Sequence, residues 1–162
     1  MARIGITGHS NLTADTVPLI RAALATALAP HTAEGDLVGL SCLARGADQL
    51  FAEAVLDAGG RLEAVLPSAD YREAKVRADE LERFDRLLLR SAFVRYMPHR
   101  SAGKAAYADA NEAVLGGIDR LFAVWDGKPA GGRGGTGDAV EAARTRGVPV
   151  DVIWPEGAAR ER

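Results

Sequence analysis

The chain has 162 residues, of which 48% are hydrophobic and 26% are charged, and its formal net charge is −2. These totals indicate one globular domain with a buried core, which we expect over 1–155, followed by a frayed C-terminal tail at 156–162. Sequence-independent binding to a nucleic-acid backbone usually needs clustered Lys and Arg, and the chain has no basic run, so nucleic acid is an unlikely partner.

Short apolar runs alternate with helical patterns along the whole chain. Strands are expected at 3–7, 36–41, 61–67, 92–98, 119–126 and 148–155. Helices are expected at 14–29, 47–59, 104–117 and 138–147, and in the second half of the charged segment 71–90. Strands separated by helices of this length need crossover connections, which produce a parallel sheet covered on both faces. The predicted fold class is therefore α/β: one Rossmann-like, doubly wound domain with a mostly parallel sheet of about six strands.

The cysteine count and the hydropathy pattern indicate where the protein works. Cys42 is the single cysteine, which excludes an internal disulfide and a cysteine-based zinc site. One free thiol is typical of a reducing compartment, and no apolar run approaches the roughly 18 residues that span a bilayer. We therefore expect a cytoplasmic protein with no membrane partner, no metal and no cofactor.

Candidate binding residues follow from the expected sheet, because ligands of such folds bind beyond the carboxyl ends of the strands. Small, polar or charged residues follow four of the expected strands. They are Gly8 and His9 after the first, Ser41, Arg45, Gly46, Ala47 and Asp48 after the second, Pro67 after the third, and Asp126 after the fifth.

A glycine-rich segment, G-R-G-G-T-G at 132–137, precedes the last expected helix. Helix N-termini carry unpaired N–H groups and a partial positive charge, and glycines let a phosphate approach those groups. We expect segment 131–136 to bind a phosphate through Gly132, Arg133, Gly134, Gly135 and Thr136. A glycine-rich turn with no ligand is the alternative. The segment lacks the Gly-Lys-Ser/Thr of a Walker A loop, and it is misplaced for a dinucleotide fingerprint, which belongs to the first strand-to-helix turn.

Three blocks of the sequence resemble the SLOG superfamily of Rossmann-like nucleotide-binding proteins, which includes the LOG phosphoribohydrolases and the DprA core domain. The blocks are "GITGHSNL", "SCLARGADQLFAEAVLDAGGRLEAVLPSADY" and "DRLFAVWDGKPAGGRGGTGDAVEAARTRGVPVDVIWP". The resemblance implies a nucleotide or nucleotide-derived ligand whose phosphate lies on the glycine-rich segment. It also implies a homodimer.

The resemblance leaves the activity open. LOG enzymes carry the motif Pro-Gly-Gly-x-Gly-Thr-x-x-Glu, in which the glutamate assists cleavage of an N-glycosidic bond. In this chain Ala139 occupies the position of that glutamate. The candidate catalytic acids are Asp48, Asp138 and Glu141. The first hypothesis is a sensor or binding protein for a nucleotide-type small molecule. The second is a nucleotide N-glycosidase or a nucleoside deoxyribosyltransferase-like enzyme, and the third is a structural or partner-binding domain.

Overall fold

The computed structural model describes residues 2–33, 35–129 and 135–162. Within these residues six strands form one sheet in the order β4-β3-β2-β1-β5-β6, and every neighbouring pair is parallel. The strands are β1 (Ala2–Gly8), β2 (Leu37–Ser41), β3 (Arg61–Leu66), β4 (Phe93–Tyr96), β5 (Arg120–Val124) and β6 (Val150–Val152). The expected Rossmann-like α/β fold is therefore confirmed.

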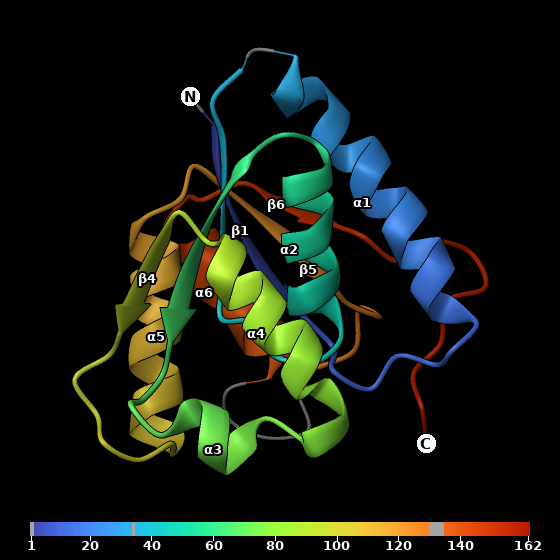
Figure 1. Cartoon of the computed structure of the whole chain (residues 1–162). Coiled ribbons are helices and arrows are strands. Elements are labelled where there is room, and N and C mark those ends of the chain that lie inside the picture. Colours follow the sequence, from blue (N-terminus) through green and yellow to red (C-terminus); the bar gives the residue numbers. More distant parts are fainter. Residues whose placement is uncertain (1, 34, 130–134) are drawn as a thin grey trace.

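Helices cover both faces of this sheet (Figure 1). They are α1 (Thr16–Thr32), α2 (Ala47–Asp57), α3 (Tyr71–Lys75), the 3₁₀ turn η1 (Ala78–Glu80), α4 (Leu81–Arg90), α5 (Lys104–Gly116) and α6 (Thr136–Thr145). Helices α1, α2 and α4 pack on one face, and α5 and α6 pack on the other. Among the described helices none is long and apolar enough to cross a membrane.

The two helical layers hold the sheet through separate apolar clusters. On one face Phe51 and Phe122 are fully buried and meet edge to face, with ring centroids 6.0 Å apart. On the other face Val114 of α5 packs on Val38 and Leu40 of β2. Burying one such side chain contributes on the order of 2 kcal/mol, so both faces of the sheet stabilise the fold.

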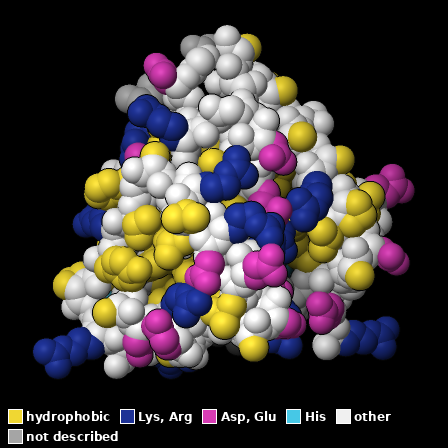
Figure 2. All heavy atoms as spheres, viewed as in Figure 1, with side chains coloured by type: hydrophobic (Ala, Val, Ile, Leu, Met, Phe, Trp, Pro, Cys, Tyr) yellow, Lys and Arg dark blue, Asp and Glu magenta, His cyan; other side chains and the backbone are white. Residues whose placement is uncertain are grey.

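Strand β4 is one of the two edge strands of the sheet. Its Phe93 and Tyr96 are more than half exposed, and Leu89 at the end of α4 is also exposed. Apolar side chains gather on this part of the face in view (Figure 2). The homodimer implied by the family resemblance stays a prediction.

The structure adds detail to two of the expected helices. The helix expected in the second half of segment 71–90 is confirmed as α4, and the first half forms the short α3 and η1, with Val76 extended between them. Helix α1 begins at Thr16 instead of 14, and the Thr13 and Thr16 hydroxyl groups are hydrogen-bonded to each other at the start of the helix.

The C-terminal segment 156–162 also differs from the frayed tail that the sequence predicts. The Thr16 hydroxyl donates to the Ala159 carbonyl (3.1 Å) and accepts from its N–H (2.9 Å). The Glu161 N–H donates to the Asn11 carbonyl at 2.6 Å. These bonds place the last residues beside the loop that follows β1.

Candidate functional site

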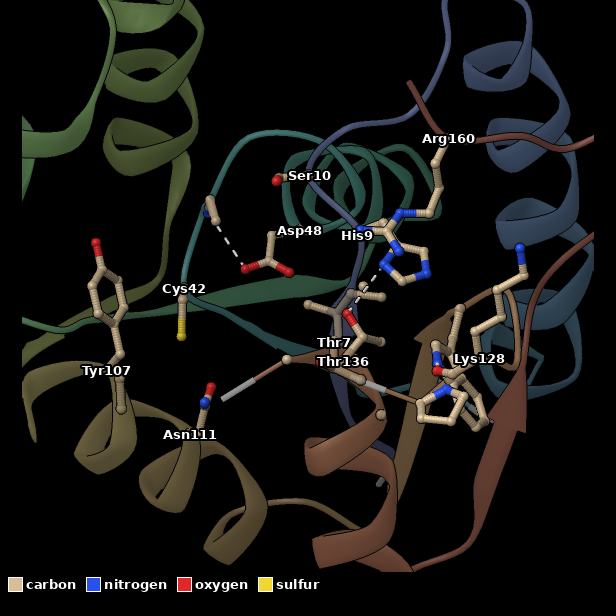
Figure 3. A pocket seen from close by; sticks show the side chains of 18 of the residues that line it. Thr7, His9, Ser10, Cys42, Asp48, Tyr107, Asn111, Lys128, Thr136 and Arg160 are labelled. Atoms are coloured by element: carbon tan, nitrogen blue, oxygen red, sulfur yellow. Dashed lines mark hydrogen bonds between the residues drawn. The ribbon is translucent and has the colours of Figure 1, made fainter. Parts of the chain in front are cut away.

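A cavity of about 360 Å³ lies beyond the carboxyl ends of β1 and β5. The chain runs from β1 to β2 on one side and returns to β5 on the other, so these two ends separate at a topological switch point, where α/β folds bind ligands. The volume lies within the roughly 300–1,000 Å³ of small-molecule sites. Loops after β1, β2 and β5, helices α5 and α6, and the C-terminal segment all contribute to its wall (Figure 3).

Two glycines let the strand and helix ends approach closely beside this cavity. A Cβ on Gly8 would lie 2.4 Å from the Ala47 Cβ. Gly46 has φ +86°, and a Cβ there would lie 2.6 Å from the His9 carbonyl oxygen. The Ala47 N–H donates to that same oxygen at 3.2 Å. Only glycine fits at these positions, so the start of α2 is fixed against the loop after β1.

Helix α6 opens onto the cavity through Gly135, Thr136 and Gly137. The N–H groups of Asp138 and Ala139 donate to the Gly135 carbonyl, at 3.1 and 3.2 Å. The first N–H groups of a helix have no acceptor within the helix itself, and its N-terminus carries a partial positive charge. This end of the cavity is therefore suited to an anion.

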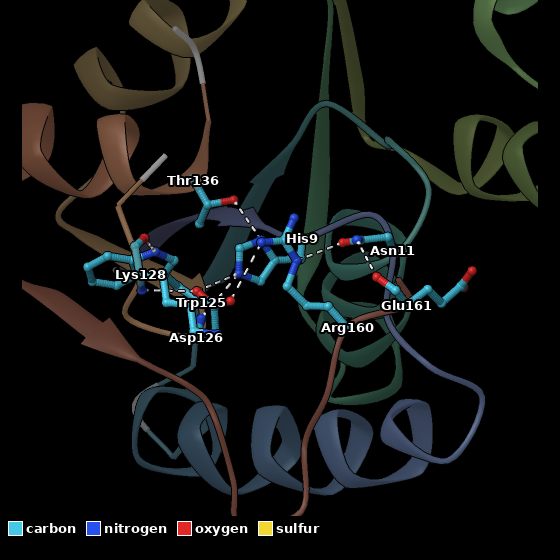
Figure 4. A network of polar contacts seen from close by, with 8 residues as sticks. All are labelled: His9, Asn11, Trp125, Asp126, Lys128, Thr136, Arg160 and Glu161. Atoms are coloured by element: carbon cyan, nitrogen blue, oxygen red, sulfur yellow. Dashed lines mark hydrogen bonds and ion pairs between the residues drawn. The ribbon is translucent and has the colours of Figure 1, made fainter. Parts of the chain in front are cut away.

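His9 is buried between β1 and α6 and organises the same end (Figure 4). The Asp126 N–H donates to His9 Nε2 at 3.1 Å, so Nε2 carries no proton. The 3.4 Å distance between His9 Nε2 and Asp126 Oδ1 is therefore not an ion pair. Burial, followed by nearby Arg160, lowers the pKa of His9 despite Asp126, which agrees with a neutral ring. The proton is then on Nδ1, 3.5 Å from the Thr136 hydroxyl oxygen. Because that oxygen accepts from His9, the Thr136 hydroxyl hydrogen is free to donate to a ligand.

Two cations, Lys128 and Arg160, line the anion-binding end. Within the described residues the Lys128 ammonium has no carboxylate partner, and its backbone is fixed by Trp125 Nε1, which donates to the Lys128 carbonyl at 2.8 Å. Arg160 comes from the C-terminal segment. Its Nε donates to Asn11 Oδ1 at 2.9 Å, and its Nη1 lies 3.5 Å from Asp126 Oδ2.

Asp48 lines the middle of the cavity from the first turn of α2. Removal from bulk water raises the pKa of Asp48 to about 7, and the Ala44 N–H, 3.4 Å from Oδ2, opposes this shift only weakly. The carboxyl group can therefore donate or accept a proton near neutral pH, and its oxygens can accept hydrogen bonds from sugar hydroxyls.

The far end of the cavity carries aromatic and amide groups. Tyr107, Ala110 and Asn111 lie three and four residues apart on α5, which places them on one helix face toward the cavity. Tyr71 meets Tyr107 edge to face, with ring centroids 6.3 Å apart. Cys42 also lines this end, and burial raises the pKa of its thiol far above the ordinary value. The cavity is thus cationic at one end and aromatic at the other.

The structure brings five of the sequence-predicted residues to this cavity, namely Gly8, His9, Asp48, Gly135 and Thr136. Three more, Ser41, Gly46 and Ala47, do not line the cavity but contact residues that do. The Ser41 hydroxyl donates to the Asp48 carbonyl at 3.1 Å and holds the loop after β2. Arg45 and Pro67 are not among the residues that line the cavity.

The remaining predicted residues lie elsewhere. Asp126 does not line this cavity itself, but it contacts three residues that do, namely His9, Lys128 and Arg160. Asp138 and Glu141 line a separate, shallow depression on α6, so the three candidate acids do not share one site. Gly132, Arg133 and Gly134 lie outside the described residues. Within the described residues no group of three or more His, Cys, Asp or Glu is arranged to hold a metal.

Several lining residues escape the sequence analysis. Tyr107 and Asn111 occur at helical spacing in an alanine-rich segment, a signal that could have been read as a ligand-facing stripe. Lys128 follows the fifth strand and satisfies the same rule that selects Asp126. Arg160 carries no such signal, because only the folded tail brings it to the cavity.

Comparison with known proteins supports the fold. No protein-family model matches the sequence, and no curated protein matches it as a relative. DNA processing protein A (DprA) from Streptococcus pneumoniae superposes with a TM-score of 0.69 at 18% identity, over 97% of this chain and 52% of that one. The chain has a DprA-like fold. It spans about half the length of the pneumococcal DprA.

Two further structures agree. DprA from Helicobacter pylori gives a TM-score of 0.67 at 16% identity, over 98% of this chain and 68% of that one, and its structure is described for a single-stranded DNA binding mode. The protein TM1055 gives 0.58 at 18% identity, over 93% and 72%. At these identities the likeness shows the fold alone.

The expectation that nucleic acid is an unlikely partner is contradicted by these neighbours. The fold matches DprA proteins, one of which is described by its binding of single-stranded DNA. The prediction was wrong because it used the net charge, which is a sum over the whole chain, whereas Lys128 and Arg160 both line one cavity. A weak overall charge therefore does not exclude a nucleic-acid ligand.

Proposed function

We propose that the cavity binds a nucleotide, with the phosphate at the α6 end and the base at the α5 end. The observation that carries this proposal is the convergence of Thr136, Lys128 and Arg160 on one end of a cavity at the switch point of the sheet. A helix N-terminus with two cations stabilises an anion without a Walker lysine. Asp48, in the middle, would accept hydrogen bonds from ribose hydroxyls, and Tyr107 offers a ring for the base.

The experiment is calorimetric titration with adenosine 5′-monophosphate and with adenosine. The nucleotide should bind at least tenfold more tightly than the nucleoside, because the phosphate contacts are lost in the latter. Lys128→Ala and Arg160→Ala should each weaken nucleotide binding by about 10- to 100-fold, the effect of removing one hydrogen bond to a charged group. Adenosine binding should hardly change.

Matched controls lie close by. Arg162→Ala alters the same C-terminal segment, and Lys75→Ala removes an exposed lysine of α3; neither residue lines the cavity. Both should bind the nucleotide as the wild type does. Equal affinity for nucleotide and nucleoside, or equal losses in the controls, would contradict the assignment of the phosphate end.

Single-stranded DNA is a second candidate, favoured by the described binding mode of the Helicobacter pylori neighbour. A ten-nucleotide single strand that displaces adenosine 5′-monophosphate competitively, and loses affinity in Lys128→Ala, would support it. A strand that binds without displacing the nucleotide would place DNA elsewhere on the molecule.

Catalysis at an N-glycosidic bond rests on Asp48, because a carboxyl group that titrates near pH 7 beside a cavity suits a general acid. Release of free base from a nucleoside monophosphate should then disappear in Asp48→Asn. It should persist in Asp138→Asn and Glu141→Gln, whose carboxylates lie outside the cavity.

A further inference from the structure

A second cavity, of about 610 Å³, adjoins the first on the side of the C-terminal segment. The two cavities share Lys128 and Arg160 in their walls. The second is otherwise lined by Trp154, Asn11, Asp126 and Glu161, among others. The two cations therefore lie at the boundary between the two cavities, with space for a ligand on both sides of them.

We propose that this double cavity binds a dinucleotide, in which two nucleosides are joined through a phosphate linkage held between Lys128 and Arg160. The inference rests on the proposed function and extends it by naming the ligand class. The first nucleoside occupies the cavity between Asp48 and Tyr107, and the second lies against Trp154. Lys128 and Arg160 lie between two cavities, where a phosphate with a nucleoside on each side would fit. A mononucleotide would need cations only at the closed end of one cavity.

The charges of the second cavity exclude a free phosphate but suit a nucleoside. Asp126 and Glu161 both line it, and neighbouring groups keep Asp126 ionised: although burial opposes this, the Lys128 N–H and Arg160 hold the pKa of Asp126 below its ordinary value. Two carboxylates repel an anion, yet they accept hydrogen bonds from sugar hydroxyls and base amino groups. The linkage phosphate is consequently confined to the boundary, where the cations lie.

Trp154 supplies the apolar surface. Its ring meets His9 edge to face, with ring centroids 5.6 Å apart and planes at 87°, so its position is fixed by the same histidine that contacts Thr136. An indole of this kind stacks on any base, because every base offers a π face. The second nucleoside is therefore bound with little base preference.

The test compares adenosine 5′-monophosphate with adenylyl-(3′→5′)-adenosine, which has one phosphate and less negative charge but two nucleosides. The dinucleotide should bind about tenfold more tightly, as expected for one additional stacked base. Trp154→Ala should bind the dinucleotide no more tightly than it binds the mononucleotide, whereas Trp154→Phe should keep most of the gain. Glu161→Gln, which preserves the backbone bond to Asn11, should reduce dinucleotide binding alone.

The outcomes separate the two proposals. Mononucleotide binding with no gain from the second nucleoside overturns the dinucleotide inference and leaves the proposed function standing. Failure of both ligands to bind overturns both. A diadenosine joined by pyrophosphate and a ten-nucleotide single strand distinguish the source: a gain restricted to the free dinucleotides indicates a small ligand, and an equal gain with the strand indicates recognition of its terminal pair. A gain that survives Trp154→Ala places the second nucleoside elsewhere and overturns the inference.

Discussion

Replacing Asp48 by Asn should stabilise the protein at pH 8 much more than at pH 5. The pKa of Asp48 is raised from 3.8 to about 7 by its removal from water. The folded protein therefore keeps a proton that the unfolded chain releases, so stability is lost as pH rises through the window between these two values. Asn carries no charge, and its side-chain oxygen can still accept from the Ala44 N–H.

The magnitude follows from the two pKa values at about 1.36 kcal/mol per unit. Ionisation of Asp48 destabilises the wild type by about 2 kcal/mol at pH 5 and by about 4 kcal/mol at pH 8. The advantage of Asp48→Asn should thus grow by roughly 2–3 kcal/mol between these pH values. For a chain of this length the change corresponds to roughly 5–10 °C in melting temperature.

Urea unfolding of both proteins at pH 5 and pH 8 measures the difference directly. Glu141→Gln, an exposed change on α6, is the control and should shift stability by less than about 0.5 kcal/mol at either pH. A stability difference between wild type and Asp48→Asn that is the same at both pH values would refute the reasoning, because it would show that the carboxyl group is solvated in the folded protein.

Three further predictions concern the walls of the cavity. Gly46→Ala should cost about 3 kcal/mol in urea unfolding because its Cβ meets the His9 carbonyl, whereas Gly59→Ala, at a similar φ of +81° but in open space, should cost only about 1 kcal/mol. The pKa of His9 is lowered in the folded protein, so the unfolded chain binds the proton more readily. The stability of the wild type, measured by urea unfolding, should therefore fall as the pH drops below about 6.5, and the fall should be shallower in His9→Gln. Ending the chain at Glu156 should lower both the melting temperature and the nucleotide affinity, because Arg160 and the bonds of Ala159 to Thr16 are lost; an unchanged affinity would exclude Arg160 from the site.

The alternation of strands and helices was predictable because each element shows its own period in the sequence. Leu24 and Leu28 repeat at helical spacing, and "LFAVW" is apolar throughout, as befits a strand buried on both faces. The second half of segment 71–90 was predictable as a helix. Its first half was harder, because there the chain forms only the short α3 and η1, with Val76 extended between them.

The candidate site was predictable from two signals, the carboxyl-end rule and the glycine-rich segment. The rule found Gly8, His9 and Asp48, and the segment found Gly135 and Thr136; all five line the cavity. Neither signal could find Arg160, because that side chain reaches the cavity through bonds between residues nearly 150 positions apart, such as its contact with Asn11. Pairings of this kind leave no periodic signal in a sequence.

A phosphate-bearing ligand at the start of α6, between β1 and the C-terminal segment, should be visible by amide NMR when isotope-labelled protein is titrated with adenosine 5′-monophosphate. The largest shifts should occur at Thr136, Gly137 and Gly8. The double variant Lys128→Ala with Arg160→Ala should lose them. Shifts confined to the β4 edge, or unchanged spectra at millimolar nucleotide, would contradict this placement of the phosphate.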